Sequence, residues 1–302
     1  MTARLQAIPA LHKWLKGGGP TPRGTPVDPE APPLLHISPH FAFGGSENNV
    51  TLIATKRVEA GHFILGVAAS SCLHARNDAV SQARRACVEK AAAAVRAAAK
   101  WKTSLVHAAD AGRLECIVLL TLELLDGKES TWWPYICTLP EPAYAAPPSL
   151  WSSLLGEHAA QALLADTSIG SLIAQDQQDL LSSLGQGLVP EAEAAVLPTA
   201  DAAAATADAA ADALQLAQLL GVAASEAEVR TAFLRAVGLV VTRLVSGVGL
   251  APLFDLMNGA PTGAHNATIE KSNLAASATA KDQAPCVAAI SSRAIEEGEE
   301  VL

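Results

Sequence analysis

Residues 250–261, LAPLFDLMNGAP, hold one carboxylate, Asp255, inside an apolar run that ends in Asn258 and Gly259. Asparagine and glycine both tolerate positive φ, so this pair suits a two-residue hairpin turn. The carboxylate and the amide are also strong hydrogen-bonding groups. Residue types and spacing alone therefore leave two interpretations open, the edge of a hairpin or part of a functional site.

Composition narrows the class of protein. The 302 residues suffice for one large domain or two ordinary ones, and half of them are hydrophobic, with much of that half alanine. The net charge of −9 argues against nucleic-acid binding, which needs a basic stripe. It suits a basic partner, such as a peptide that presents a lysine.

The cysteine pattern and the first residues bear on the compartment. The cysteines stand at 72, 87, 116, 137 and 286. None has C-x-x-C spacing, so neither a metal site nor a disulfide framework is indicated. Residues 1–20 lack the apolar core of a signal peptide. We expect a monomeric protein of the cytoplasm, the nucleus or an organelle matrix, not secreted. The apolar run 236–254 contains Arg243 and is expected in the core, not in a membrane.

The elements that must position Asp255 follow from periodicity. Residues 4–16 carry apolar side chains at helical spacing and end at Gly17. Short β-branched runs at 34–38, 50–58 and 62–67 predict strands of a small antiparallel sheet. The turn 59–61, EAG, is expected to form a hairpin between the last two.

The sequence after these strands has helical periodicity. We expect helices over 77–103, 114–125 and 226–244, and further helical pieces over 148–185. Residues 186–223 are dominated by alanine, which is typical of a surface helix or a flexible insert.

After Pro252 the sequence again predicts strands, at 266–272, 286–292 and 295–302. Since neither β segment is large enough to stand alone, we expect one sheet shared by both, an α+β fold split by a long helical insertion. The predicted divisions are a leading helix 1–20, β parts 34–76 and 236–302, and the insert 77–235.

Five quoted pieces, in order, resemble the SET-domain methyltransferases with a helical insert, the group of Rubisco large-subunit lysine methyltransferase and the actin-histidine methyltransferase. They are RLQAIPALHKWLKGGG (4–19), NNVTLIATKRVEAGHFILGV (48–67), STWWPYICTLP (130–140), VVTRLVSGVGLAPLFDLMNG (240–259) and AISSRAIEEGEEVL (289–302). The resemblance covers nearly the whole chain. It implies a small β-sheet SET domain with a helical insertion, S-adenosylmethionine as the cofactor, no metal, and a protein substrate that presents a lysine.

The resemblance also implies roles for individual residues. Arg243 would pair with the cofactor carboxylate through a bidentate fork, while its alternative role is to cap its own helix. The family's D-x-x-N-H turn packs beside the cofactor, which makes Asp255, Leu256, Met257, Asn258 and Gly259 candidates, with Gly259 in place of the family histidine. Asn48, Asn49 and Val50 stand at the family's cofactor-facing turn, or in a plain loop turn. Arg4 matches an N-terminal cofactor contact, or is an exposed surface arginine.

The acceptor and the catalytic group are the remaining inferences from the resemblance. In the actin-histidine enzyme an asparagine near the substrate hydrogen-bonds the imidazole, and here that position is Val245, which favours lysine. Val245 could instead pack only in the core. The family's catalytic tyrosine follows the GEE strand, so we expect it beyond Leu302, and expect the 302-residue chain, read as a fragment, to be inactive by itself. Trp132, Trp133 and Tyr135 are expected to be packing residues. The alternative function is a non-catalytic SET-like binding module.

Overall fold

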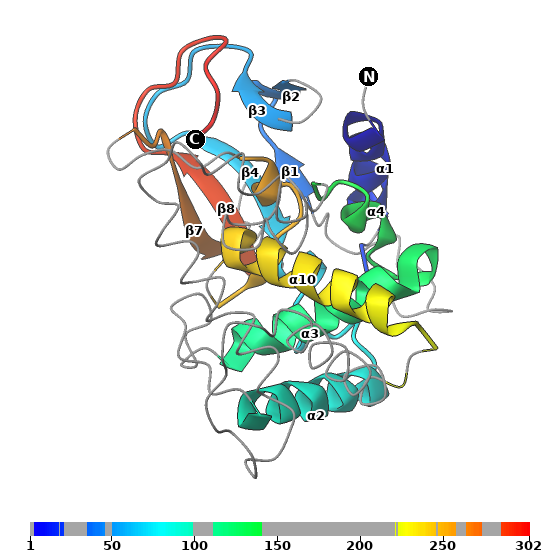
Figure 1. The fold of residues 1–302 in the computed structure, drawn as a ribbon. Helices are drawn as coiled ribbons and strands as arrows, with labels where there is room; N and C mark the ends of the chain where they lie inside the picture. The colour runs from blue at the N-terminus through cyan, green and yellow to red at the C-terminus, as the bar shows by residue number, and fades with distance from the viewer. Residues whose placement is uncertain are drawn as a thin grey trace, which may run out of the picture. The chain divides into compact units, whose positions relative to one another are not determined.

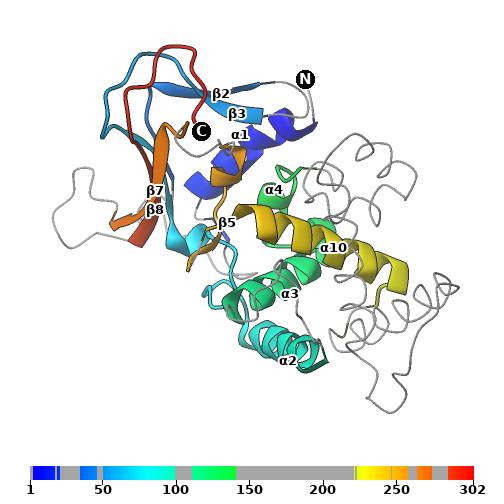
Figure 2. The ribbon, with the colours of Figure 1, turned by 60° about the vertical axis from the view of Figure 1, so that its left-hand side comes forward.

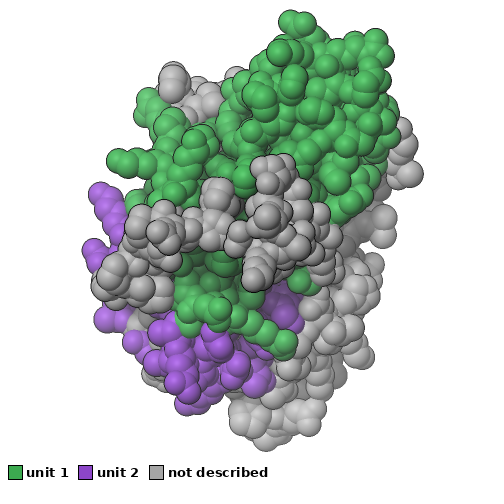
Figure 3. Space-filling model, turned by 180° about the vertical axis from the view of Figure 1, so that it is seen from behind, with its two compact units in different colours: residues 1–80, 131–140, 243–302 green, residues 81–130, 141–242 purple. Residues whose placement is uncertain are grey.

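The computed structural model of the chain describes residues 3–17, 19–20, 35–45, 50–98, 111–140, 221, 223–245, 247–257, 264–273 and 285–302. Short antiparallel sheets and helices make the fold α+β, as expected from the sequence (Figures 1 and 2). The chain forms two compact units. Unit 1 comprises Met1–Val80, Thr131–Pro140 and Arg243–Leu302, and unit 2 comprises Ser81–Ser130 and Glu141–Thr242 (Figure 3).

The main sheet of unit 1 joins strands from both ends of the chain. Its order is β1-β4-β8-β7, formed by β1 (Leu35–Ile37), β4 (Phe63–Ala68), β8 (Pro285–Ser291) and β7 (Ala267–Asn273), all antiparallel (Figure 1). Figures 1 and 2 both show β7 beside β8. The pairing of β4 with β8 confirms that the two distant β segments share one sheet.

A hairpin that follows β1 forms a second sheet of unit 1. β2 (Phe41–Gly45) pairs with β3 (Val50–Ala54). The other edge of β3 takes the segment 299–301, because Ala54 N–H donates to the Glu299 carbonyl at 2.9 Å and Val301 N–H donates to the Leu52 carbonyl at 2.8 Å. β3 is therefore paired on both edges.

This pairing corrects the expected hairpin turn at 59–61. β3 pairs with β2, and β4 pairs with β1 and β8, so the two strands that flank this turn belong to different sheets. The reason is that β3 and β4 find partners far away in the sequence. The glycine-rich β2 was not predicted from the sequence.

The leading helix agrees with its prediction. α1 (Ala3–Lys16) ends where Gly17 N–H donates to the Lys13 carbonyl at 2.9 Å, and Gly19, at a φ of 65°, donates to the Trp14 carbonyl. A glycine tolerates this left-handed conformation, so it stops the helix.

The helix α1 packs against β1 and against the short helix α4 (Trp133–Ile136). Trp132 and Tyr135 are fully buried, as expected of packing residues. Both lie in the stretch Thr131–Pro140 of unit 1.

Unit 2 contains α2 (Gln82–Ala98), α3 (Ala111–Asp126) and most of α10 (Glu226–Arg243). α2 begins at Gln82 rather than at the predicted residue 77. Ser81 caps it, since Arg84 N–H donates to Ser81 Oγ at 3.2 Å. Asn77 instead closes a turn with its side chain, whose Oδ1 accepts Ala79 N–H at 2.9 Å.

Helices α2 and α3 lie side by side and are joined by ion pairs around the buried Glu123 (Figure 2). Arg84 contacts the carboxylates of Glu123 and Asp126, each at 2.9 Å. Ser130 Oγ donates to Glu123 at 2.5 Å. Burial raises the pKa of Glu123, while Arg84 and Ser130 oppose that rise.

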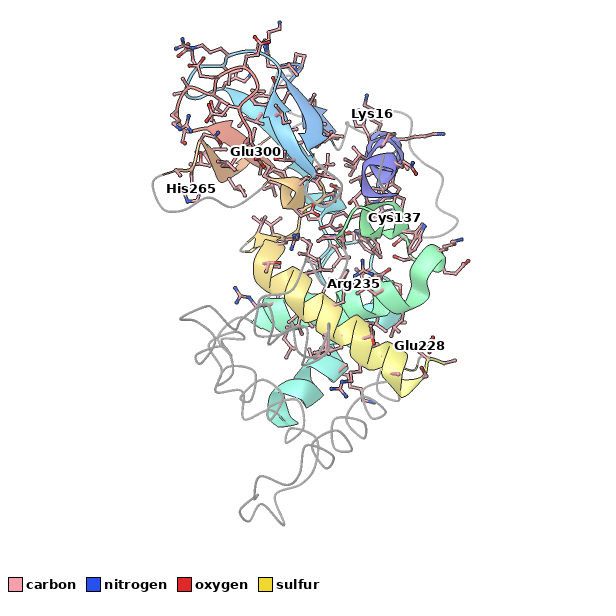
Figure 4. All side chains as sticks on the ribbon, turned by 45° about the horizontal axis from the view of Figure 1, so that its top comes forward. Lys16, Cys137, Glu228, Arg235, His265 and Glu300 are labelled. Carbon is pink, nitrogen blue, oxygen red and sulfur yellow. The ribbon has the colours of Figure 1, made fainter. Side chains whose placement is uncertain are left out.

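α10 starts with a capping box. Ser225 N–H and Oγ both contact the Glu228 carboxylate, at 2.8 and 2.7 Å, and Glu228 N–H donates to Ser225 Oγ. Figure 4 shows Glu228 at this end of α10 and Arg235 farther along it. The predicted helix over 226–244 is thus confirmed. The segments 148–185 and 186–223 lie outside the described residues, except for Gly221 and Ala223. Within the described part of the chain, no helix is long and apolar enough to cross a bilayer.

Candidate functional site

The segment that carries Asp255 is fixed to unit 1 by a close backbone crossing. β5 (Leu244–Val245) pairs with β6 (Gly249–Leu250). Leu250 and Leu73 exchange two backbone hydrogen bonds, of 2.9 and 3.1 Å. Gly249 has a φ of 112°, and a Cβ there would lie 2.5 Å from the Leu73 carbonyl oxygen. Only a glycine allows this approach.

A strained residue then turns the chain. Leu253 has a φ of 73° and is the one non-glycine residue with positive φ in the described ranges. It precedes η5 (Phe254–Leu256), in which Leu256 N–H donates to the Leu253 carbonyl at 3.1 Å. A left-handed leucine costs about 1–3 kcal/mol and persists only where its surroundings fix it. Leu253 is buried, so packing holds this turn.

Asp255 therefore lies in a turn of 3₁₀ helix and not at the edge of a hairpin. Both of its carboxylate oxygens are buried. Leu256 is buried and Met257 is partly exposed. η5 contacts β3, whose first residue is the buried Val50. The structure thus brings η5, which carries the predicted residues Asp255 and Leu256, to the strand that begins at Val50.

The other residues predicted to bind the cofactor or the substrate either lie elsewhere in the fold or fall outside the described residues. Arg243 is the last residue of α10, with its Nε buried, and Val245 lies partly exposed in β5. Both stand in the stretch that leads through β6 to η5. Arg4 lies in α1, and its side chain is outside the description. Asn48, Asn49, Asn258 and Gly259 lie outside the described residues.

A second polar group in unit 1 surrounds His62. Its Nε2 lies 2.9 Å from Ser38 Oγ, and its ring packs edge-on against His40 at 5.1 Å between centroids. Burial lowers the pKa of His62, and the charge of His40 lowers it further. In the described ranges, no three His, Cys, Asp or Glu side chains lie close enough together to hold a metal ion.

Sequence reasoning missed three residues that shape this region: Thr51, Gly249 and Leu253. Gly249 follows Gly247 in a G-x-G pattern, which signals an unusual backbone. Nothing in the sequence marks Leu253. Thr51 reads as an ordinary strand residue, although its hydroxyl is buried.

Comparison with known proteins bears on the fold. No protein-family model matches the chain, and no curated protein sequence matches it. The structure matches the crystal structure of the SET domain of LSMT bound to lysine and AdoHcy, with a TM-score of 0.55 and 16% sequence identity. The match covers 98% of this chain and 53% of that one, so the chain spans about half the length of the solved protein. At this identity the likeness is one of fold. The chain accordingly has the fold of a SET domain.

Proposed function

We propose that the chain is a protein methyltransferase of the SET type that uses S-adenosylmethionine and acts on lysine rather than histidine. The observation that carries the proposal is the likeness of nearly the whole chain to a SET domain that holds both AdoHcy and lysine. The packing of η5 on β3 adds to it, because it gathers predicted cofactor residues in unit 1.

The residues present are suited to such a cofactor, which supplies a methyl group on a sulfonium together with an amino group and a carboxylate. Arg243 would hold the carboxylate, for which a guanidinium offers two parallel donors. Asp255 offers buried carboxylate oxygens as acceptors. Val50, Leu256 and Met257 would form apolar walls. Exclusion of water strengthens each polar contact inside such a site.

The resemblance of the sequence extends the proposed site beyond the described side chains. Asn48 and Asn49 would complete the turn before Val50, and Asn258 and Gly259 would complete the segment after Met257. Gly259 supplies the backbone groups of the family histidine but not its ring. Arg4 would approach from the leading helix.

The choice of lysine rests on Val245. A valine wall leaves a buried imidazole N–H unpaired, at a cost of about 1–3 kcal/mol. A lysine stem packs against the same apolar wall, and burial lowers the pKa of its amine toward the reactive neutral form. The net charge of −9 attracts a lysine-bearing protein.

We also propose that the β parts 34–76 and 236–302 form one SET domain around the helical insert 77–235. In this assignment the helices α2, α3 and α10 belong to the insert, apart from the last turns of α10.

The test has two stages. Calorimetry of the chain with AdoHcy should show one binding site, and absence of binding would overturn the proposal. Mass spectrometry of proteins methylated by the full gene product should then find methyllysine. A predominance of methylhistidine would overturn the acceptor, and binding without transfer would favour the non-catalytic module.

A further inference from the structure

Among the buried serine and threonine side chains that the structure describes, one hydroxyl has no hydrogen-bond partner. It belongs to Thr51, which is 3% exposed and whose Oγ1 is fully enclosed. The other buried serines and threonines there all have partners, namely Ser38, Ser71, Thr121, Ser130, Thr138 and Ser291. Buried hydroxyls are satisfied in nearly all folded proteins, so an exception calls for a cause.

The strand β3 cannot shift to bring the Thr51 hydroxyl to a hydrogen-bond partner, because both of its edges are paired. β3 is paired with β2 on one edge and with the segment 299–301 on the other. Thr51 lies directly opposite Gly44, which has no side chain to accept a hydrogen bond. The space above Gly44 is taken by Ile53, whose Cδ1 would lie 2.6 Å from a Cβ built there. The nearest cross-strand surroundings of the hydroxyl are therefore apolar.

The location of Thr51 suggests what the missing partner is. Thr51 directly follows Val50, and its strand contacts η5, which carries Asp255. We infer that Thr51 Oγ1 hydrogen-bonds a polar atom of the bound S-adenosyl ligand, an inference that rests on the proposed function. The free protein keeps an unsatisfied hydroxyl, and the ligand supplies its partner.

This role makes stability and affinity respond in opposite directions. Thr51→Val replaces the hydroxyl by a methyl group of similar volume. The ligand-free chain should then unfold at the same temperature or higher, because a buried unsatisfied group is removed. AdoHcy should bind about tenfold to hundredfold more weakly, because one buried hydrogen bond to the ligand is lost. A hydroxyl with a purely structural role would lower stability and spare affinity.

The experiment measures thermal unfolding and calorimetric AdoHcy binding of the 302-residue chain and its variants. Thr51→Ser keeps the hydroxyl and should bind within about threefold of the original chain. The matched control is Thr121→Val in α3, since Thr121 is equally buried but donates to the Ile117 carbonyl at 2.8 Å. It should lose stability and keep its affinity.

If Thr51→Val binds AdoHcy with unchanged affinity, whether or not its unfolding temperature falls, the role of Thr51 is overturned while the proposed function stands. If Thr51→Val fails to fold, Thr51→Ser and Thr51→Ala decide: equal affinities in these two variants would also overturn it. Absence of AdoHcy binding by the unchanged chain would overturn the proposed function, and the inference with it.

Discussion

Val58 and Ile295 exchange two backbone hydrogen bonds, of 2.9 and 3.0 Å, although they lie near opposite ends of the chain. The neighbouring backbone hydrogen bonds form two equivalent pairs, one on each side of this bridge. Gly298 N–H donates to the Ala54 carbonyl, and Gly61 N–H donates to the Ser291 carbonyl, both at 2.8 Å. Gly61 and Gly298 both have a positive φ, of 83° and 82°. Two strand–turn segments thus clasp each other with approximate twofold symmetry, and this clasp joins the two β parts of unit 1.

Arg243 should matter for affinity more than for stability. Arg243→Ala should weaken binding of S-adenosylmethionine by about 1.5–3 kcal/mol, the scale of a charge-assisted hydrogen bond. Arg243→Lys keeps the charge but loses the fork, so an intermediate affinity is expected. Calorimetry measures both variants. Unchanged affinity with a lower unfolding temperature would assign Arg243 to capping its own helix.

Gly249 should be intolerant of any side chain. Gly249→Ala combines a positive φ with a Cβ 2.5 Å from the Leu73 carbonyl oxygen, and should cost about 3 kcal/mol or more. Gly61→Ala is the matched control, since Gly61 has a φ of 83° and nothing within 4 Å of the new Cβ. It should cost only about 1–2 kcal/mol. Urea unfolding compares the two, and equal losses would show that the crossing at Leu73 relaxes freely.

Arg84 should be an important charge in unit 2. Arg84→Ala leaves the buried Glu123 without its cation, which should cost about 3 kcal/mol of unfolding free energy. The control is Arg57→Ala, which breaks exposed contacts with Glu59 and Glu296 and should cost less than about 1 kcal/mol. Chemical denaturation at neutral pH tests the difference. Similar small losses of unfolding free energy in both variants would mean that water solvates Glu123 once Arg84 is removed.

His62 should make the chain sensitive to mild acid. Its pKa in the folded chain lies below the ordinary 6.5, chiefly because of burial and further because of His40. The unfolded chain then takes up the proton first, so stability is full above pH 6.5 and falls as the pH drops below it. His62→Gln should flatten this fall between pH 7 and 5 in urea titrations. An unchanged slope in His62→Gln would show that burial of this imidazole does not cause the acid sensitivity.

Local signals in the sequence were reliable guides to the helices. The helix predicted over 226–244 is present as α10, and the glycines after Lys16 end α1. The start of α2 was misjudged because Asn77 prefers to close a turn with its own side chain, which helical periodicity does not reveal.

Strand pairing was harder to predict because it depends on distant partners. The turn 59–61 resembles a hairpin, yet the strands beside it bind to segments from the other end of the chain. The buried hydroxyl of Thr51 escaped notice for the same reason, since burial in β3 depends on pairing at both edges. Arg243, Asp255 and Val50 came from a family resemblance, and their roles stay predictions.

The pairing of β4 with β8 has a consequence for synthesis. β4 ends at Ala68, and its partner strand begins at Pro285. At about 5–20 residues per second, the ribosome makes the intervening chain in roughly 10–40 s. During this time the edge of β4 that β8 later covers lacks its partner, and an unpaired edge is prone to join other chains. We expect the nascent protein to need a chaperone during this wait.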